Sequence, residues 1–199
     1  MNNKFNPDIH HRKSIRLNEY DYSQEGLYFI TMCVQNRENI FGDIENHKLT
    51  LNPLGEIAQK EWLNTINIRD NIKLHEFIIM PNHIHGIIEI TKNKSKPEDN
   101  QGFKSPTQTI GSIVRGFKIA TIKQIKEYIS KGELQFAPTS ERTDIDKGEL
   151  QFAPTIKNLD YKIWQRNYYE HIIKDEKAYK NISSYILTNP ERWIEDKLR

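Results

Sequence analysis

In some parts of the chain apolar residues form short continuous runs, and in other parts they recur every three or four residues. This pattern predicts both strands and helices. The densest apolar run, 72–90, is broken in its middle by Pro81 and Asn82, which predicts two strands joined by a tight connection. Short runs rich in β-branched and aromatic residues predict further strands. The predicted strands are 28–34, a short extension at 48–51, 72–79, 83–91 and an extended segment within 161–173.

The helical segments are marked by apolar residues on one face and by their end signals. Asn52 before Pro53 has the pattern of an N-cap followed by proline at the first helical position. Asp175 is placed to open the last long helix, and the Asn-Pro pair after Thr188 is placed to end it. The predicted helices are 53–66, about 108–129, 175–188 and a short terminal one within 192–199.

The order of these elements predicts an α+β fold. Strand, helix, two strands, helix, strand and helix match a ferredoxin-like sandwich, with an antiparallel sheet and helices packed on one face. We expect a polar N-terminal arm over 1–26, one domain over 27–193 and a tail over 194–199. Nine residues at 131–139 recur unchanged at 147–155, which predicts an acidic loop insertion over 131–157.

Composition excludes several classes of protein. Hydrophobic residues make up 36% of the 199 residues, which is enough for a core and too much for a disordered chain. No apolar run approaches the roughly 18 residues of a membrane span, and the polar N-terminus predicts no secretory signal. The single cysteine, Cys33, excludes a disulfide framework and a cysteine-built zinc site. We therefore expect a cytoplasmic protein without a membrane partner.

The formal net charge of +2 hides a local basic segment. Between Phe103 and Lys131 six basic residues stand against one acidic residue, so the predicted helix 108–129 can attract a phosphate backbone. The same charges also fit an ordinary solvated helix face. The candidate nucleic-acid contacts are Arg115, Lys118 and Lys123 on this helix and Arg12 and Lys13 in the N-terminal arm.

His83 and His85 are two apart on a predicted strand, and alternation places them on the same face. Two imidazoles on one face are the beginning of a divalent metal site. Two polar residues on a solvated strand face would give the same pattern, and this alternative stays open from spacing alone.

Tyr185 and Asn189 are four apart on the last helix and share a face. A tyrosine can attack a phosphodiester, and a nearby amide oxygen can complete a metal's ligand set. A core aromatic on an amphipathic helix fits Tyr185 equally well on pattern alone.

The segment 164–171 interleaves aromatic residues with Arg166. Such a segment can stack on unpaired bases and hold a phosphate, or it can contribute its rings to the core.

Four segments in this order, 28–31, 80–85, 164–171 and 185–190, resemble the REP-associated tyrosine transposases, which are single-tyrosine HUH transposases with an IS200-like domain. The resemblance spans about residues 12–193. It implies that His83, His85 and Asn189 bind Mg²⁺ or Mn²⁺ and that Tyr185, on the late helix, is the catalytic nucleophile. Arg115, Lys118, Lys123, Arg166, Arg12 and Lys13 remain the candidates for holding DNA.

The resemblance implies metal-dependent cleavage and transfer of single-stranded DNA at hairpins of palindromic repeats, through a 5′-phosphotyrosine. Such a protein would be found with the nucleoid. Relatives can exchange the late helix between subunits, so both a monomer and a homodimer are compatible with the sequence. A DNA-hairpin-binding protein that has lost its chemistry is the alternative function.

Overall fold

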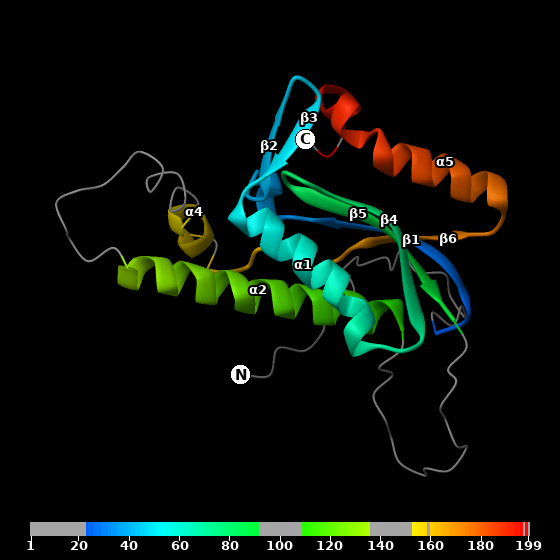
Figure 1. Cartoon of the computed structure of the whole chain (residues 1–199), viewed down its shortest axis with the longest axis horizontal. Helices are drawn as coiled ribbons and strands as arrows, with labels where there is room; N and C mark the ends of the chain where they lie inside the picture. Colours follow the sequence, from blue (N-terminus) through cyan, green and yellow to red (C-terminus); the bar gives the residue numbers. More distant parts are fainter. Residues whose placement is uncertain (1–22, 92–108, 136–152, 159, 197, 199) are drawn as a thin grey trace, which may run out of the picture.

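The computed structural model describes residues 23–91, 109–135, 153–158, 160–196 and 198 of the chain. Its centre is a four-stranded antiparallel sheet with the strand order β4-β5-β1-β6 (Figure 1). Apart from a small hairpin, two 3-10 helices and the short helix α4 (Ala153–Asn158), the described residues form the βαββαβ arrangement of a ferredoxin-like sandwich, followed by one further helix. The predicted fold class is therefore confirmed. The sheet strands are β1 (Gly26–Cys33), β4 (Ile72–Met80), β5 (His83–Ile90) and β6 (Tyr169–Ile173).

Helices cover both faces of this sheet. The helices α1 (Pro53–Ile68) and α2 (Ile110–Gln135) pack together on one face, as predicted, whereas α5 (Glu176–Leu187) lies on the opposite face (Figure 1). Alternation along β1 produces the two surfaces, because Ile30 contributes to the α1/α2 side and Phe29 to the α5 side. Both central strands are consequently rich in buried apolar residues.

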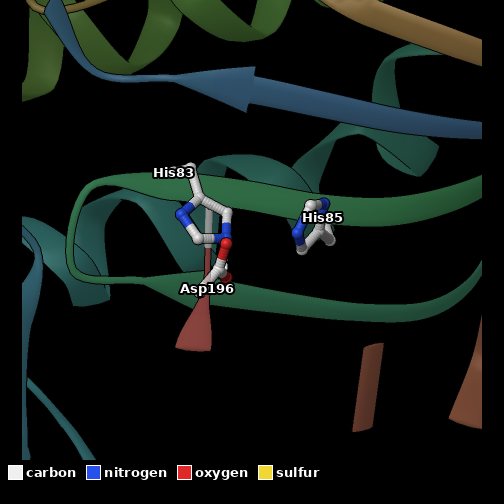
Figure 2. Close-up of side chains that lie close together, drawn as sticks. All are labelled: His83, His85 and Asp196. Atoms are coloured by element: carbon white, nitrogen blue, oxygen red, sulfur yellow. Dashed lines mark ion pairs between the residues drawn. The ribbon is translucent and has the colours of Figure 1, made fainter. Parts of the chain in front are cut away.

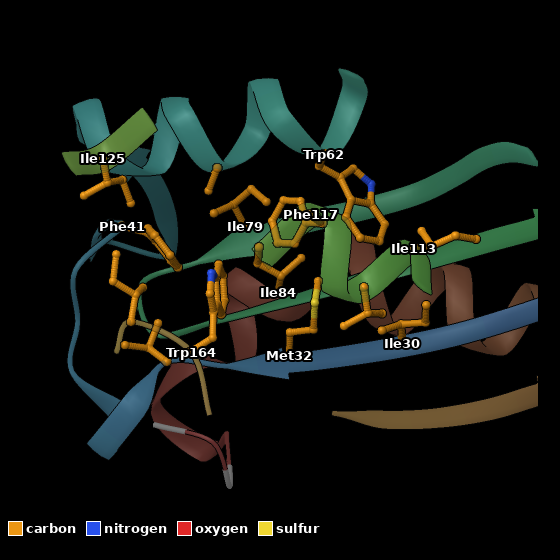
Figure 3. Packing of buried hydrophobic residues seen from close by; sticks show 14 of the residues in the cluster. Ile30, Met32, Phe41, Trp62, Ile79, Ile84, Ile113, Phe117, Ile125 and Trp164 are labelled. Carbon is orange, nitrogen blue, oxygen red and sulfur yellow. The ribbon is translucent and has the colours of Figure 1, made fainter. Parts of the chain in front are cut away.

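The larger core lies between the sheet and the α1/α2 layer (Figure 3). Trp62 of α1 is fully buried and packs edge to face on Phe117 of α2, with ring centroids 5.5 Å apart. Phe117 in turn contacts the ring of Trp164, which precedes β6. The smaller core beneath α5 contains four buried residues, Phe29, Ile87, Ile173 and Ile186.

Caps fix where two of the helices begin. The Asn52 side chain accepts hydrogen bonds from the backbone N–H groups of Leu54 and Gly55, both at 3.0 Å, as the Asn-Pro pattern predicts. The Asp175 carboxylate accepts one from the N–H of Ala178 at 2.8 Å and starts α5 directly after β6.

Several boundaries differ from the prediction. The extension at 48–51 is strand β3 (Lys48–Leu51), and it pairs with a strand that the pattern did not indicate, β2 (Gly42–Glu45). The predicted loop insertion contains the end of α2 and all but the last residue of the helix α4 (Ala153–Asn158). Its centre lies outside the described residues, as do Arg12 and Lys13. Residues after α5 form the 3-10 helix η2 (Asn189–Glu195) rather than a helix over 192–199.

None of the described helices is long and apolar enough to span a membrane.

Gly86 provides a test of this packing. A β-carbon there would collide with Cζ2 of Trp62 and lie 3.2 Å from Cβ of Phe77. Gly86→Ala should therefore lower the free energy of unfolding by about 1–3 kcal/mol, measured by urea denaturation. Gly116→Ala is the matched control, because its β-carbon would meet only the flexible end of the Arg69 side chain. Equal stability of Gly86→Ala and wild type would contradict the packing described.

Candidate active site

His83 and His85 both project from the α5 face of β5, as alternation predicted (Figure 2). Their side chains are buried, with relative exposures of 0% and 2%, and their ring centroids are 4.5 Å apart. The alternative of two solvated polar residues is therefore wrong. Burial is the largest cause that lowers the pKa of each imidazole to about 3, so both rings are neutral near pH 7 and can offer lone pairs.

Asn82 orients the first of these rings. Its amide nitrogen donates to the carbonyl oxygens of Arg37 and Leu198, which leaves Oδ1 to face His83. Oδ1 lies 2.8 Å from His83 Nδ1 and can only accept, so Nδ1 carries the proton and Nε2 presents its lone pair to the site. The sequence offered one signal for this role, the position of Asn82 directly before the His-Ile-His motif.

Thr31 and Phe29 hold the second ring from β1. Thr31 lies opposite His85 in the strand register, and its Oγ1 is 2.8 Å from Nδ1 of that ring. The Phe29 ring stacks on the imidazole with centroids 5.3 Å apart. His85 Nε2 is thereby directed toward α5, where the hydroxyl of Tyr185 lies 3.2 Å away.

Tyr185 and Asn189 approach the histidines from α5 and the start of η2. Burial raises the pKa of the Tyr185 phenol, and the negative charge of Asp196 adds to this rise. A hydrogen bond with Asn189 and the positive charge of Arg192 act in the opposite direction. Asn189 is buried, with 1% exposure, so the predicted face shared by Tyr185 and Asn189 does point into the site.

Asp196 also enters this site, although it belongs to the segment predicted as a tail. Trp193 is buried beside His83, with ring centroids 6.1 Å apart, and fixes the chain three residues earlier. Asp196 Oδ1 accepts the N–H of Leu198 at 2.7 Å, and Oδ2 lies 3.7 Å from Nε2 of His83 (Figure 2). The sequence signal for this placement was the position of Trp193, a large apolar residue that packs readily, directly before the segment predicted as a tail.

The unsatisfied atoms of this cluster fit a divalent cation. The ligand atoms of His83, His85 and Asp196 all lie within 4.8 Å of one another. Three buried atoms, His83 Nε2, Asp196 Oδ2 and Asn189 Oδ1, have no hydrogen-bond partner. Since His83 is neutral, its contact with Asp196 is not an ion pair. Buried polar atoms are rarely left unsatisfied, and imidazole, carboxylate and amide groups are all metal ligands.

Tyr179 occupies a separate polar cluster on the same helix. Its hydroxyl donates to Glu76 Oε2 at 2.9 Å, and Ser183 donates to the same oxygen at 3.1 Å. His75 Nδ1 is 3.2 Å from the Tyr179 hydroxyl. A bulge between Leu74 and Phe77 places His75 and Glu76 toward α5. Of the two tyrosines on α5, Tyr185 is thus the one that faces the two buried histidines.

The predicted DNA contacts have different environments. Arg115, Lys123 and Arg166 are exposed. Lys118 instead donates to the backbone oxygens of Gln165 and Asn167 at 2.7 and 3.1 Å, and burial lowers its pKa to about 8. Lys118 therefore holds the segment before β6 through hydrogen bonds, a structural role that the charge pattern did not indicate. Because α2 lies on the sheet face opposite the histidines, Arg115, Lys118 and Lys123 are not assembled with them, whereas Arg166 lies just before β6.

The chain has a close relative and a structural neighbour. No protein-family model matches it. It is 41% identical over 206 residues to an uncharacterized protein from Haemophilus influenzae. This alignment covers all of this chain and 98% of the relative. A REP-associated tyrosine transposase solved with a REP hairpin aligns with 90% of this chain and 74% of its own, with a TM-score of 0.52 and 15% identity. The chain belongs to one family with the Haemophilus influenzae protein and has the fold of a REP-associated tyrosine transposase.

Proposed function

We propose that this protein is a single-tyrosine HUH transposase that cleaves and rejoins single-stranded DNA at hairpins. The observation that carries the proposal is the placement of the Tyr185 hydroxyl 3.2 Å from the buried His85, within a cluster of unsatisfied metal-ligand atoms. The shared fold supports the same function. The transposase named above was solved with a REP hairpin, and we extend a hairpin substrate to this chain as part of the proposal.

Tyr185 Oη is the nucleophile. It forms a bond to the scissile phosphorus while the bond from phosphorus to the 3′ oxygen breaks, which leaves a 5′-phosphotyrosine and a free 3′-hydroxyl. The phenolic proton is lost and the leaving oxygen gains one, so the exchange is balanced. A later attack by a 3′-hydroxyl reverses the linkage and restores the phenol. The Asn189 side chain and Arg192 both favour the phenolate form of Tyr185.

His83, His85, Asp196 and Asn189 would hold a divalent cation, with Mg²⁺ and Mn²⁺ as the candidate ions. A bound cation would polarise the scissile phosphate and offset the negative charge that develops on it. Asn82 and Thr31 act on the ligands themselves, since each contacts Nδ1 of one imidazole and leaves Nε2 directed into the site.

One chain supplies every residue of the proposed site. Tyr185 reaches His85 of its own sheet, and α5 follows β6 without a long connection, because Asp175 caps the helix two residues after Ile173. The proposal therefore requires no exchange of helices within a homodimer. A DNA-processing role would place the protein with the nucleoid.

Tyr185→Phe tests the chemistry. With Mn²⁺ or Mg²⁺ and a hairpin from the DNA flanking its gene, wild type should form a covalent adduct that survives denaturing electrophoresis. The variant should form none, because it lacks the nucleophilic oxygen, while its hairpin affinity stays within about twofold of wild type. Tyr179→Phe is the matched control and should keep the adduct.

Two results would contradict the proposed function. Binding without any wild-type adduct would favour a hairpin-binding protein without chemistry. Nicked DNA without an adduct would favour hydrolysis by water.

Asp196→Asn tests the cation site independently of activity. Titration calorimetry with Mn²⁺ should show one site in wild type and at least about tenfold weaker binding in the variant, since even hydrogen-bond partners of metal ligands cost about 10–100-fold. Asn189→Ala should weaken binding in the same way. Asp43→Asn, at an exposed aspartate of β2, should bind like wild type. Unchanged Mn²⁺ affinity in Asp196→Asn would remove this residue from the ligand set.

A further inference from the structure

The edge strand β6 presents two exposed rings on the same face of the sheet as the proposed active site. Tyr169 lies opposite Thr31 in the register with β1, and Thr31 lies opposite His85 in the register with β5. His171 lies opposite Phe29 on the next rung of the same face. Because neighbouring strands are about 4.8 Å apart, Tyr169 is about 10 Å across the sheet from His85.

Tyr169 differs from the other aromatic residues in its exposure. Its side chain is 51% exposed, and it is the one exposed phenylalanine, tyrosine or tryptophan among the described residues. In the same segment Trp164 is buried in the core and Tyr168 packs against that core. The structure thus divides the aromatic segment 164–171 into core residues and the exposed Tyr169.

Contacts beneath Tyr169 connect it to the nucleophile. Its ring meets Phe29 edge to face, with centroids 6.3 Å apart. Phe29 is 9% exposed and also contacts the rings of His85 and Tyr185, at 5.3 and 6.2 Å. One face of Tyr169 is therefore supported by a buried aromatic cluster that includes the nucleophile, while half of its surface stays open to solvent.

The packing of α5 explains why this surface is open. The helix packs mainly on β4 and β5, and β4 and β6 are the two opposite edge strands of the sheet. The end of the sheet at β6 is therefore less covered by α5. Arg166 and Lys174 flank β6, both are exposed, and neither has an ion-pair partner within the described ranges. One basic residue before β6 and one after it, together with the two exposed rings on the strand, offer both kinds of contact that unpaired DNA makes, in which bases stack on rings and phosphates meet cations.

We propose that Tyr169 and His171 form a stacking site for the unpaired DNA bases adjoining the phosphate that is cleaved. This inference rests on the proposed function for its location but concerns a separate binding step. In this proposal β6 recognises the unpaired bases of the single strand. His83, His85 and Tyr185 need not contact any base.

The experiment uses the full chain carrying Tyr185→Phe, which lacks the oxygen that the proposed reaction needs, and follows the binding of a fluorescein-labelled dT12 oligonucleotide by fluorescence anisotropy. Tyr169→Ala in this background should weaken dT12 binding about tenfold, and His171→Ala by a smaller factor, as expected for the loss of one stacked base. Tyr169→Phe keeps the ring and should bind like the parent. Ile119→Ala removes an exposed apolar side chain from α2 on the other face and should also bind like the parent.

A second probe separates stacking from general loss of binding. Replacing single thymines of dT12 by 2-aminopurine should give fluorescence quenching that Tyr169→Ala relieves and Tyr169→Phe preserves. Undetectable dT12 binding by the parent, an unchanged affinity in Tyr169→Ala, or an equal loss in Ile119→Ala would each overturn the inference. Tyr169-dependent binding without any wild-type adduct would instead reject only the proposed chemistry, and an adduct with unaffected dT12 binding would reject only the stacking site.

Discussion

The burial of two neutral imidazoles on one strand is the constraint on which the rest of the site depends. A buried imidazole is stable only if its polar atoms find partners, and burial here lowers both pKa values to about 3. Asn82 and Thr31 each satisfy one nitrogen and fix the ring. The remaining nitrogens face α5 and the end of the chain. Tyr185, Asn189 and Asp196 converge there because these two segments cover the histidines.

The parts of the fold outside the site hold this arrangement in place. The Glu76 carboxylate, which a bulge turns toward α5, accepts hydrogen bonds from Tyr179 and Ser183 and ties the helix that carries Tyr185 to β4. The turn between β2 and β3 supports η2, the segment that follows α5, since His47 Nδ1 lies 2.9 Å from the backbone oxygen of Glu191 in η2. Substitutions at these distant contacts would therefore affect the geometry of the site as well as stability.

Local sequence signals predicted the elements well, because caps, breaks and alternation act within a few residues. Asn52, Asp175 and the Pro81-Asn82 break all mark real boundaries. They could not indicate on which face α5 packs, since an amphipathic helix specifies only that one side is buried. Nor could they bring Thr31 and Asp196 to the histidines, because those contacts depend on strand register and on the path of the chain after Trp193. The charge pattern likewise missed that Lys118 binds backbone oxygens.

Peptide mapping of the covalent adduct would show whether the oxygen of Tyr185 becomes bonded to DNA. Tryptic digestion yields a peptide of residues 181–192 that contains Tyr185 and no other tyrosine, whereas Tyr168, Tyr169 and Tyr179 fall in other peptides. We predict that mass spectrometry finds the nucleotide mass on Tyr185 in this peptide. A nucleotide on any other tyrosine would contradict the proposed role of Tyr185.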